Sequence, residues 1–453
     1  MLLSSRGPKH LPLLGHIPWM AVDPIKFFSQ LTHRYGDVVP LRMGVSKVLF
    51  VNQPALINQL IRDRNCWRSD QSRKAIRSFL GDGLLALEGD THLRHRRLVS
   101  PAFRRDRFRE YAALMCSETA AELAQWRPSE TRDIREDMYR LTFSIVSKAL
   151  FSADTSGEAD EVGIAIKEVL PWMLLNASLA GLGTWVPTWY PPSARVSLKR
   201  LKQLVHDIVG RRLAEGGDRG DLLSMLLAAR DEEGGALSQD DICDESLTLL
   251  MAGHDTTAST MAWACYLLAQ NPAIQTDVAA EIRAVAGDAA ITMDMLGRLP
   301  LTQQVIDETL RLFPVVWIGD RTPQKDIKLG EYDVPAGRRV MFSMFVTQRD
   351  GRFFPDPERF DPARFSPQRV NEIPDGAYLP FGAGVHMCPG NNFALMEARL
   401  ILAAILQRFE LSLVPEHRVR LDPQVVLSPV GELPLLLRAR THTEPSLETA
   451  HAM

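Results

Sequence analysis

One cysteine occupies a glycine-rich turn, residues 381–390 with the sequence FGAGVHMCPG, directly before a predicted helix over residues 391–407. Backbone N–H groups at the start of a helix point at such a sulfur and the helix dipole favours negative charge there, so the position favours a thiolate at Cys388. Zinc would need three or four protein ligands, and neither a CxxC motif nor a pair of histidines lies nearby. A single thiolate on iron is the ligation of a heme-thiolate centre. A buried, inert thiol is the alternative.

A second unusual segment lies inside a long predicted helix. Ser238 and Asp241 have the spacing of a capping box, and the helix continues for roughly 30 residues. It is apolar on nearly every side, which predicts that it is buried. Its centre nevertheless reads AGHDTT, residues 252–257. A glycine there costs up to ~1 kcal/mol, and a buried carboxylate needs a partner. Such costs are typical of functional sites, which makes the segment with Gly253, Asp255, Thr256 and Thr257 a candidate functional site.

Two charged pairs have helical spacing. His92 and Arg96 are four residues apart in a predicted helix over residues 91–99, and Glu308 and Arg311 are three apart in one over residues 301–313. Either spacing puts both side chains on one face of a helix. Such pairs are also common on solvated helix surfaces, so neither identifies a site alone.

Together these segments resemble the cytochrome P-450 family. The turn at 381–390 matches the family's heme-binding signature F-x-x-G-x-[RH]-x-C-x-G, with His386 where Arg is more frequent. Residues 252–257 match the oxygen-activation motif [AG]-G-x-[DE]-T-[TS]. Glu308 and Arg311 match E-x-x-R, and residues 357–360 read PERF. The motifs occur in the family's order over nearly the whole chain.

The resemblance assigns roles to individual residues. Asp255 and Thr256 would be the acid–alcohol pair that handles protons at the distal side. Glu308, Arg311 and Arg359 would form a buried charge triad that braces the heme side. The cofactor would be heme b, with Cys388 as the protein ligand of its iron. The predicted heme-binding residues are Cys388, His92, Arg96, Arg321, Phe381, Gly382, Gly384, His386, Gly390 and Ala252.

The substrate pocket predicted from family position is apolar and has no carboxylate or cation as an anchor. This composition indicates a lipophilic small molecule such as a terpenoid or a fatty-acyl compound, without choosing between them. The residues are Phe79, Leu80, Leu84, Leu250, Gly253, Val315, Val316, Trp317 and Val430.

The fold implied is mainly α with small β-sheets, in a single large heme domain over residues 1–440 and a disordered tail at 441–453. The periodicity predicts helices at 23–36, 54–62, 111–126, 138–151 and 221–235, a hairpin at 38–51, and short strands at 315–318 and 334–342. Residues 69–89 read as a loop, and in the family residues 171–192 would form a mobile lid.

Composition limits the functional classes. The chain has 453 residues, 45% of them apolar and 24% charged, which excludes global disorder. The formal net charge of -3 argues against nucleic-acid binding. Five scattered cysteines suggest no disulfide framework and a reducing cytoplasm. The apolar N-terminal segment is short and broken by prolines, whereas a membrane span takes about 20 apolar residues, so no transmembrane anchor is expected. A monomer is expected.

The leading functional interpretation is a monooxygenase that inserts one atom of O2 into its substrate. Electrons from NAD(P)H would arrive through a separate ferredoxin or flavodoxin and its reductase, because no flavin or nicotinamide fingerprint follows Cys388. An arginine-rich run (Arg94, Arg97, Arg104, Arg105, Arg107 and Arg109) could dock an acidic redox protein or be a solvated charge run. The alternatives are a heme-thiolate isomerase, dehydratase or peroxygenase without a reductase, and a heme gas sensor. Asp255 and Thr256 favour the monooxygenase.

Overall fold

The computed structural model describes residues 7–44, 46–103, 107–152 and 188–440, together with residues 168, 169, 172 and 176. The predicted disordered tail at 441–453 lies outside the described residues, as does most of the predicted lid at 171–192. Among the helices that are described, none combines the length and the apolar character needed to cross a membrane.

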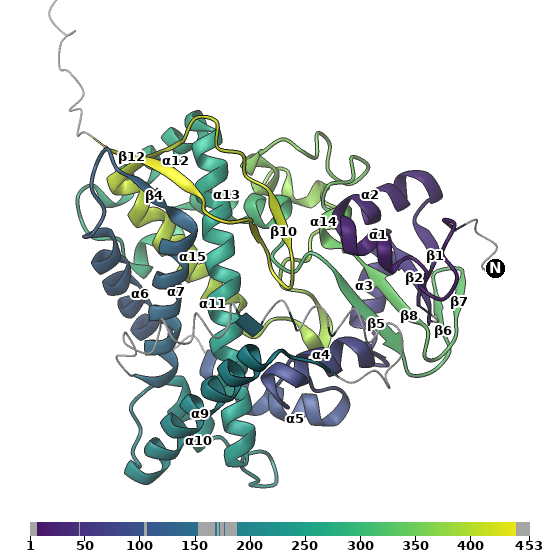
Figure 1. The fold of residues 1–453 in the computed structure, drawn as a ribbon. Helices are drawn as coiled ribbons and strands as arrows, with labels where there is room; N and C mark the ends of the chain where they lie inside the picture. The colour runs from purple at the N-terminus through teal and green to yellow at the C-terminus, as the bar shows by residue number, and fades with distance from the viewer. Residues whose placement is uncertain are drawn as a thin grey trace, which may run out of the picture.

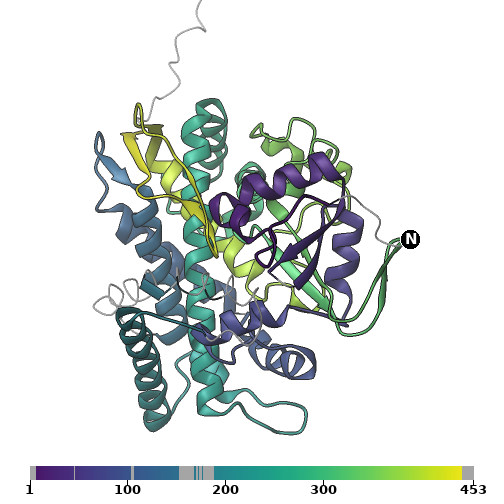
Figure 2. The ribbon, with the colours of Figure 1, turned by 45° about the vertical axis from the view of Figure 1, so that its right-hand side comes forward.

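The long helix α11, Gln239–Gln270, runs through the middle of the molecule (Figure 1). The predicted capping box is present at its start, because the Ser238 hydroxyl accepts from the Asp241 N–H at 3.1 Å and the Asp241 carboxylate accepts from the Ser238 N–H at 3.0 Å. Helices α6 (Phe108–Leu123), α7 (Ile134–Phe151) and α15 (Asn391–Arg408) lie on one side of it. The largest sheet lies on the other, as a second view also shows (Figure 2).

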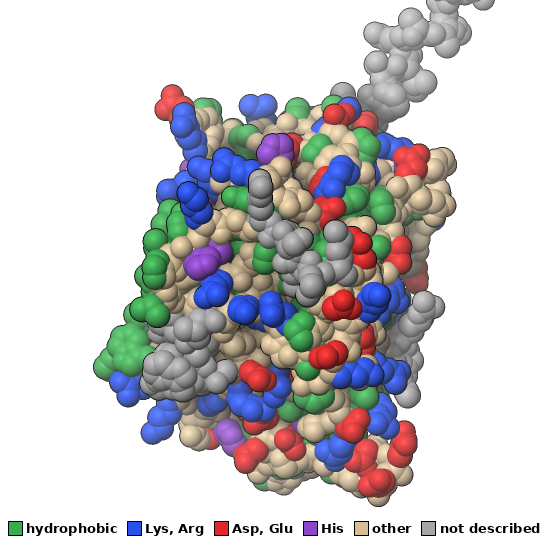
Figure 3. Space-filling model, turned by 90° about the vertical axis from the view of Figure 1, so that its right-hand side faces the viewer, with side chains coloured by type: hydrophobic (Ala, Val, Ile, Leu, Met, Phe, Trp, Pro, Cys, Tyr) green, Lys and Arg blue, Asp and Glu red, His purple; other side chains and the backbone are tan. Residues whose placement is uncertain are grey.

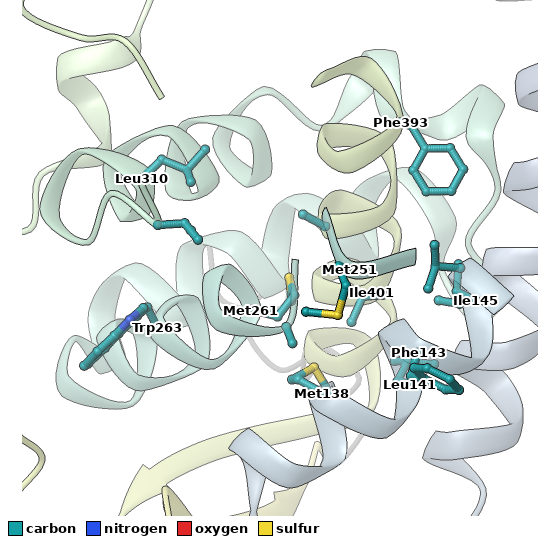
Figure 4. Close-up of a cluster of buried hydrophobic side chains, with 14 of the residues drawn as sticks. Met138, Leu141, Phe143, Ile145, Met251, Met261, Trp263, Leu310, Phe393 and Ile401 are labelled. Atoms are coloured by element: carbon teal, nitrogen blue, oxygen red, sulfur yellow. The ribbon is translucent and has the colours of Figure 1, made fainter. Parts of the chain in front are cut away.

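Buried side chains of α7, α11 and α15 form the centre of the main hydrophobic cluster (Figure 4). Met138 and Leu141 come from α7, Met251 and Met261 from α11, and Ile401 from α15. Because three helices pack here at close range, the polar residues of α11 are placed by rigid neighbours.

The remaining helices surround this centre. They are α1 (Ile17–Val22), α2 (Pro24–Tyr35), α3 (Pro54–Arg62), α4 (Asp70–Leu80), α5 (Gly89–Val99), α9 (Pro192–Glu215), α10 (Leu222–Ala228), α12 (Pro272–Ala286), α13 (Pro300–Leu312) and α14 (Met344–Thr347). Five short 3-10 helices complete the helical part that the structure describes, at residues 100–103, 293–298, 362–365, 370–372 and 384–386.

The main sheet has five strands in the order β1-β2-β8-β5-β3. The hairpin of β1 (Val38–Met43) and β2 (Ser46–Val51) agrees with prediction, and β2 pairs in parallel with β8 (Arg339–Phe342), Val48 opposite Arg339. Antiparallel pairs join β8 to β5 (Gly319–Pro323) and β5 to β3 (Cys66–Trp67). The smaller sheets are β4 (Thr131–Asp133) with β12 (Pro434–Ala439) and β9 (Phe409–Leu413), β6 (Ile327–Leu329) with β7 (Tyr332–Val334), and β10 (Leu421–Pro423) with β11 (Leu427–Pro429).

Three predicted elements were wrong. Residues 70–80 form α4 instead of a loop, because Ser69 caps the helix by accepting from the Ser72 N–H at 3.2 Å and Phe79 is buried on its inner face. Helix α10 ends at Ala228 instead of continuing to Gly234, since the Asp231 carboxylate accepts from the Gly235 N–H at 2.6 Å and closes a loop.

The third error is the strand predicted at 315–318. The carbonyl oxygens of Val315 and Trp317 accept from Leu427 N–H and the Ser343 hydroxyl, at 2.9 and 2.8 Å. This segment therefore bonds to the start of β11 and to the N-cap of α14, and the strand begins at Gly319.

Charges of both signs are mixed on the face shown in Figure 3, which agrees with the small net charge of -3. The arginine run predicted as a docking patch is partly neutralised. Arg94 pairs with Asp231 at 2.7 Å, Arg97 with Glu232 at 2.7 Å and Arg107 with Glu110 at 3.2 Å. Residues 104–106 of this run lie outside the described part.

Candidate active site

The loop that carries Cys388 is held in one conformation by its backbone. The Cys388 N–H donates to the Phe381 carbonyl oxygen at 2.9 Å and closes the turn. Gly384 has φ +67°, and a Cβ there would lie 2.9 Å from the Ile61 carbonyl oxygen at the end of α3. Only glycine combines this backbone conformation with that close approach. Gly382, at φ +68°, makes the other left-handed step.

Two groups beside the Cys388 sulfur favour a thiolate, but burial outweighs them. Burial raises the pKa of the thiol above its ordinary value, and the Gly390 N–H and the nearby Arg96 guanidinium lower it by less. Arg96 is itself held by donating through Nη1 to the Met387 carbonyl oxygen. Together with a bound metal cation such as iron, these groups would stabilise a thiolate at Cys388.

Cationic and imidazole side chains gather beside this loop. His386 lies 2.7 Å from the Glu88 carboxylate through Nε2, and its ring is 4.4 Å from that of His92. Arg68 also pairs with Glu88, at 3.2 Å. Burial, followed by the positive neighbours, lowers the pKa of His92 to about 3. The same causes, burial first, lower the pKa of His386, which therefore has less charge than its exposed form would carry.

Arg321 adds a further buried charge. It is 8% exposed, its Nη1 donates to the Asp320 carbonyl oxygen at 2.7 Å, and its buried Nε–H makes no hydrogen bond to the described residues. Burial and the like charge of Arg68 lower the pKa of Arg321 to about 10. Desolvated cations with an unused donor are costly unless an anion joins them. The group formed by Arg68, His92, Arg96, Arg321 and His386 thus fits a ligand with acidic substituents, which the propionates of heme would supply.

Two small residues at the centre of α11 are less buried than most of their neighbours in the helix. Ala252 and Thr256, one turn apart, are half-buried, whereas most residues from Ile242 to Leu268 are buried. The Thr256 hydroxyl donates to the Ala252 carbonyl oxygen at 2.7 Å. A helix face of this kind, in a chain that packs closely elsewhere, is suited to lie against a cofactor or substrate.

Asp255 and Gly253 face helix α7. Asp255 is 8% exposed, and burial raises the pKa of its carboxyl to about 6. A Cβ at Gly253 would lie 2.8 Å from Val146 Cγ2, so this glycine allows α11 to approach α7. Packing between helices thus accounts for Gly253, and its predicted contact with substrate stays a prediction.

The predicted charge triad is wrong in one member. Arg311 forms two hydrogen bonds to Glu308, at 2.7 and 2.8 Å, and both side chains are fully buried. Arg359 is exposed and contributes only its carbonyl oxygen, which accepts from Arg311 at 3.2 Å. The third side chain is Arg364, 4% exposed, whose Nε lies 3.4 Å from Glu308 Oε1. The 3-10 helix at 362–365 turns this arginine inward.

The predicted pocket residues fall into two groups. Phe79, Leu80 and Leu84 are buried at the end of α4 and after it, where the Asp82 N–H bonds to Asp244 of α11 at 2.7 Å. The second group lies where residues 315–317 meet residues 424–430. Trp317 is buried there, with its Nε1–H bonded to the Gln424 carbonyl oxygen at 2.9 Å. The remaining predicted members are placed as follows: Leu250 and Val315 are buried, and Val316 and Val430 are exposed.

Four residues of the site were missed in the sequence: Glu88, Tyr139, Arg364 and Glu397. Glu397 of α15 gave a usable signal, because an acid stands within the apolar pattern of its helix. It is 1% exposed, next to Thr257 of α11, and burial raises its pKa to about 8. Glu88 and Tyr139 gave none, since their partners His386 and Asp255 are far away in the sequence.

No group of three or more His, Cys, Asp or Glu side chains within the described part of the chain is placed to hold a metal ion. An iron that brings its own equatorial ligands and takes one thiolate is compatible with such a chain. A long central helix that carries Asp255 and Thr256, together with a closed cysteine loop beside a buried arginine, is the arrangement expected of the heme-thiolate class.

The chain belongs to the cytochrome P-450 family, whose model, described as cytochrome P-450, matches residues 5–433. The heme domain of cytochrome P-450DA superposes with a TM-score of 0.86 at 25% identity, covering 96% of this chain and 98% of that one. The predicted fold class is thereby confirmed. The enzyme is a heme-thiolate monooxygenase that uses O2 and reducing equivalents from a partner, as predicted.

Three similar proteins are named for oxygenation or synthesis. Cyclooctatin synthase of Streptomyces melanosporofaciens is 36% identical over 93% of both chains. Cyclooctat-9-en-7-ol 5-monooxygenase of the same organism is 34% identical, covering 91% of this chain and 90% of its own. Pentalenene oxygenase of Streptomyces avermitilis is 31% identical, covering 97% and 98%.

Proposed function

We propose that this enzyme oxygenates a cyclic terpenoid at a heme held by Cys388. The observation that carries the heme assignment is the closed cysteine loop before α15, together with the buried guanidinium of Arg321, whose Nε–H makes no hydrogen bond to the described residues. The terpenoid assignment is supported by the similar proteins named for cyclooctat-9-en-7-ol and pentalenene, which match more than 90% of the chain. The apolar character of the predicted pocket residues agrees with it.

The chain's own residues would divide the work. Cys388 would supply the thiolate, while Arg96, Arg321, His92 and His386 would hold the acidic substituents of the heme. The bound heme would supply the activation of O2. Thr256, on the half-buried face of α11, would hold a proton close to the reacting oxygen through its hydroxyl. Asp255 would take protons from solvent and pass them toward that face.

Carbon monoxide difference spectra test the ligand. The reduced protein should show the far red-shifted Soret band of thiolate ligation, and Cys388→His should move the band to the position of imidazole-ligated heme. Cys116→Ser is the matched control, because Cys116 is also half-buried but its thiol bonds to the Ile291 carbonyl oxygen. A band that persists in Cys388→Ala would exclude Cys388 as the ligand.

A binding screen tests the substrate class. Cyclic terpene hydrocarbons and alcohols should shift the heme band by displacing iron-bound water, and straight-chain fatty acids of similar carbon number should do so more weakly. A screen in which only the fatty acids shift the band would overturn the terpenoid assignment and leave the heme assignment intact.

The electron donor is a separate protein, either a ferredoxin or a flavodoxin with its reductase. Support comes from the arginines of α5 beside the Cys388 loop: Arg97 is 60% exposed in its side chain, and its surface ion pair with Glu232 contributes little stability and can be exchanged. Five free cysteines support a reducing compartment for the enzyme. Reduction rates with each donor type, at low and high salt, distinguish the two.

A further inference from the structure

The carboxyl group of Asp255 is anchored on α7, away from the face of α11 that carries Thr256. The Tyr139 hydroxyl of α7 hydrogen-bonds to the Asp255 carboxylate. Successive residues of a helix point about 100° apart, and the Thr256 hydroxyl is bonded to the Ala252 carbonyl oxygen instead. In this structure, Asp255 and Thr256 therefore have different hydrogen-bond partners.

The Tyr139 side chain is itself held in place by α11. The His254 ring lies 3.9 Å from the Tyr139 ring at 70°, and His254 Nε2 bonds to the Tyr139 carbonyl oxygen at 3.0 Å. The Thr142 hydroxyl reaches the His254 carbonyl oxygen at 3.3 Å, one turn along α7. Because these hydrogen bonds and the ring contact hold Tyr139 and His254 together, the Tyr139 phenol points in a defined direction, toward Asp255.

A half-buried arginine of α7 acts on the Asp255 carboxyl at this contact. Arg135, one turn before Tyr139, is half-buried and acts on Asp255 and on Asp422 of β10. Tyr139 is half-buried too. Arg135 and Tyr139 are thus partly exposed side chains of α7 that act on the buried carboxyl of Asp255.

We infer that Tyr139 is a positioning residue for the monooxygenase reaction, which anchors the Asp255 carboxyl against α7 and controls its turn toward Thr256. In the anchored state Asp255 exchanges protons with water near Arg135. After protonation the carboxyl is a weaker acceptor for the Tyr139 hydroxyl, so the bond loosens and the side chain can carry its proton toward the Thr256 face. The inference rests on the monooxygenase activity and adds a residue of α7 to its proton delivery.

The direction of the effect on titration follows from the hydrogen bond. A donor to a carboxylate favours the charged form, so the Tyr139 hydroxyl lowers the pKa of Asp255 against the larger opposing effect of burial. Tyr139→Phe should raise that pKa further above about 6. The other titratable groups facing this contact stay in place, namely Arg135 and Glu136 of α7, His254 of α11, and Asp422 of β10 through Arg135.

Infrared difference spectroscopy of the holoenzyme measures this without turnover. The band of the protonated Asp255 carboxyl, assigned by its loss in Asp255→Asn, should titrate with a midpoint about one pH unit higher in Tyr139→Phe. Tyr266→Phe is the matched control, since it also removes a phenolic hydroxyl, one on α11 that accepts from Gln270 Nε2 at 2.8 Å. An unchanged midpoint in Tyr139→Phe, or an equal shift in Tyr266→Phe, would overturn the inference.

A double-mutant comparison tests the functional part. Oxygen consumption with a surrogate ferredoxin and reductase should show a pH limb displaced to higher pH in Tyr139→Phe, by the same amount as the infrared midpoint. In the Asp255→Asn background, Tyr139→Phe should have no further effect, because Tyr139 acts through that carboxyl. A limb that does not move, or additive effects in the double variant, would show that Tyr139 only supports the fold. Because the Cys388 spectrum is read separately, a failure here is distinguishable from a failure of the heme assignment.

Discussion

The buried charges around Glu308 allow a stability prediction that separates two neighbouring arginines. Arg311 donates to both oxygens of Glu308 and to the carbonyl oxygens of Gln348, Pro357 and Arg359. Removing one side of a buried ion pair costs about 3–5 kcal/mol. Each carbonyl left without a donor adds about 1 kcal/mol. Arg311→Ala should therefore cost at least about 5 kcal/mol, which is comparable with the whole stability of a folded domain.

Arg364→Ala should have a smaller but clear effect. Its Nε lies 3.4 Å from Glu308 and its Nη2 donates to the Asp356 carbonyl oxygen at 2.8 Å. Hydrogen bonds of charged groups contribute about 1.5–3 kcal/mol, which sets the expected loss. Arg359→Ala is the matched control: its side chain is exposed, only its backbone is used, and the change should stay within about 0.5 kcal/mol.

Urea denaturation provides the assay, followed in parallel by circular dichroism and by the Soret band. The order of midpoints should be Arg359→Ala close to the parent, then Arg364→Ala, with Arg311→Ala giving little heme-loaded protein. If Arg359→Ala lost as much stability as Arg364→Ala, the placement of the third arginine would be refuted. Normal heme content in Arg311→Ala would refute the buried brace as a whole.

Two further predictions concern side chains on and beside α11. Thr256→Ala should spare folding, because the hydroxyl bonds only to the Ala252 carbonyl of its own helix, and should turn reductant consumption largely toward peroxide. Unchanged product per NAD(P)H would contradict this proton role. Glu397 has a folded-state pKa raised by burial from 4.5 to about 8, so its contribution to stability is full below the unfolded pKa and is lost as pH rises to about 8. Glu397→Gln should remove this loss of unfolding free energy with rising pH, which amounts to roughly 1 kcal/mol per pH unit at most. Urea denaturation midpoints measured at several pH values test this. If the midpoints of parent and variant changed equally with pH, the prediction would be disproved.

Local chemistry was enough to predict several parts of the molecule. The capping box of Ser238 and Asp241 and the apolar length behind it predicted α11 with its correct ends. The glycines of the Cys388 loop were predicted from the turn they allow, and two of them have the left-handed backbone that requires glycine. These features depend on residues within a few positions of one another, so the sequence displays them directly.

Other parts depended on which side of a segment faces inward. Arg359 and Arg364 lie in one short stretch and look alike, yet only Arg364 turns toward Glu308. Helix α4 has a polar sequence, and its few buried side chains, Ala75, Phe79 and Leu80, are explained only by the neighbours that bury them.

The sequence by itself determined the chemistry: one thiol before a helix, an acid and an alcohol within a buried helix, and an acid–base pair at helical spacing. The tertiary structure decided the partners, because contacts between distant segments depend on how helices pack. Tyr139 of α7 meets Asp255 of α11, and Glu88 meets His386, across separations that no local pattern encodes. Burial is also a tertiary quantity, and it is burial that moves the pKa of Asp255 to about 6 and so makes a carboxylate useful for proton transfer near neutral pH.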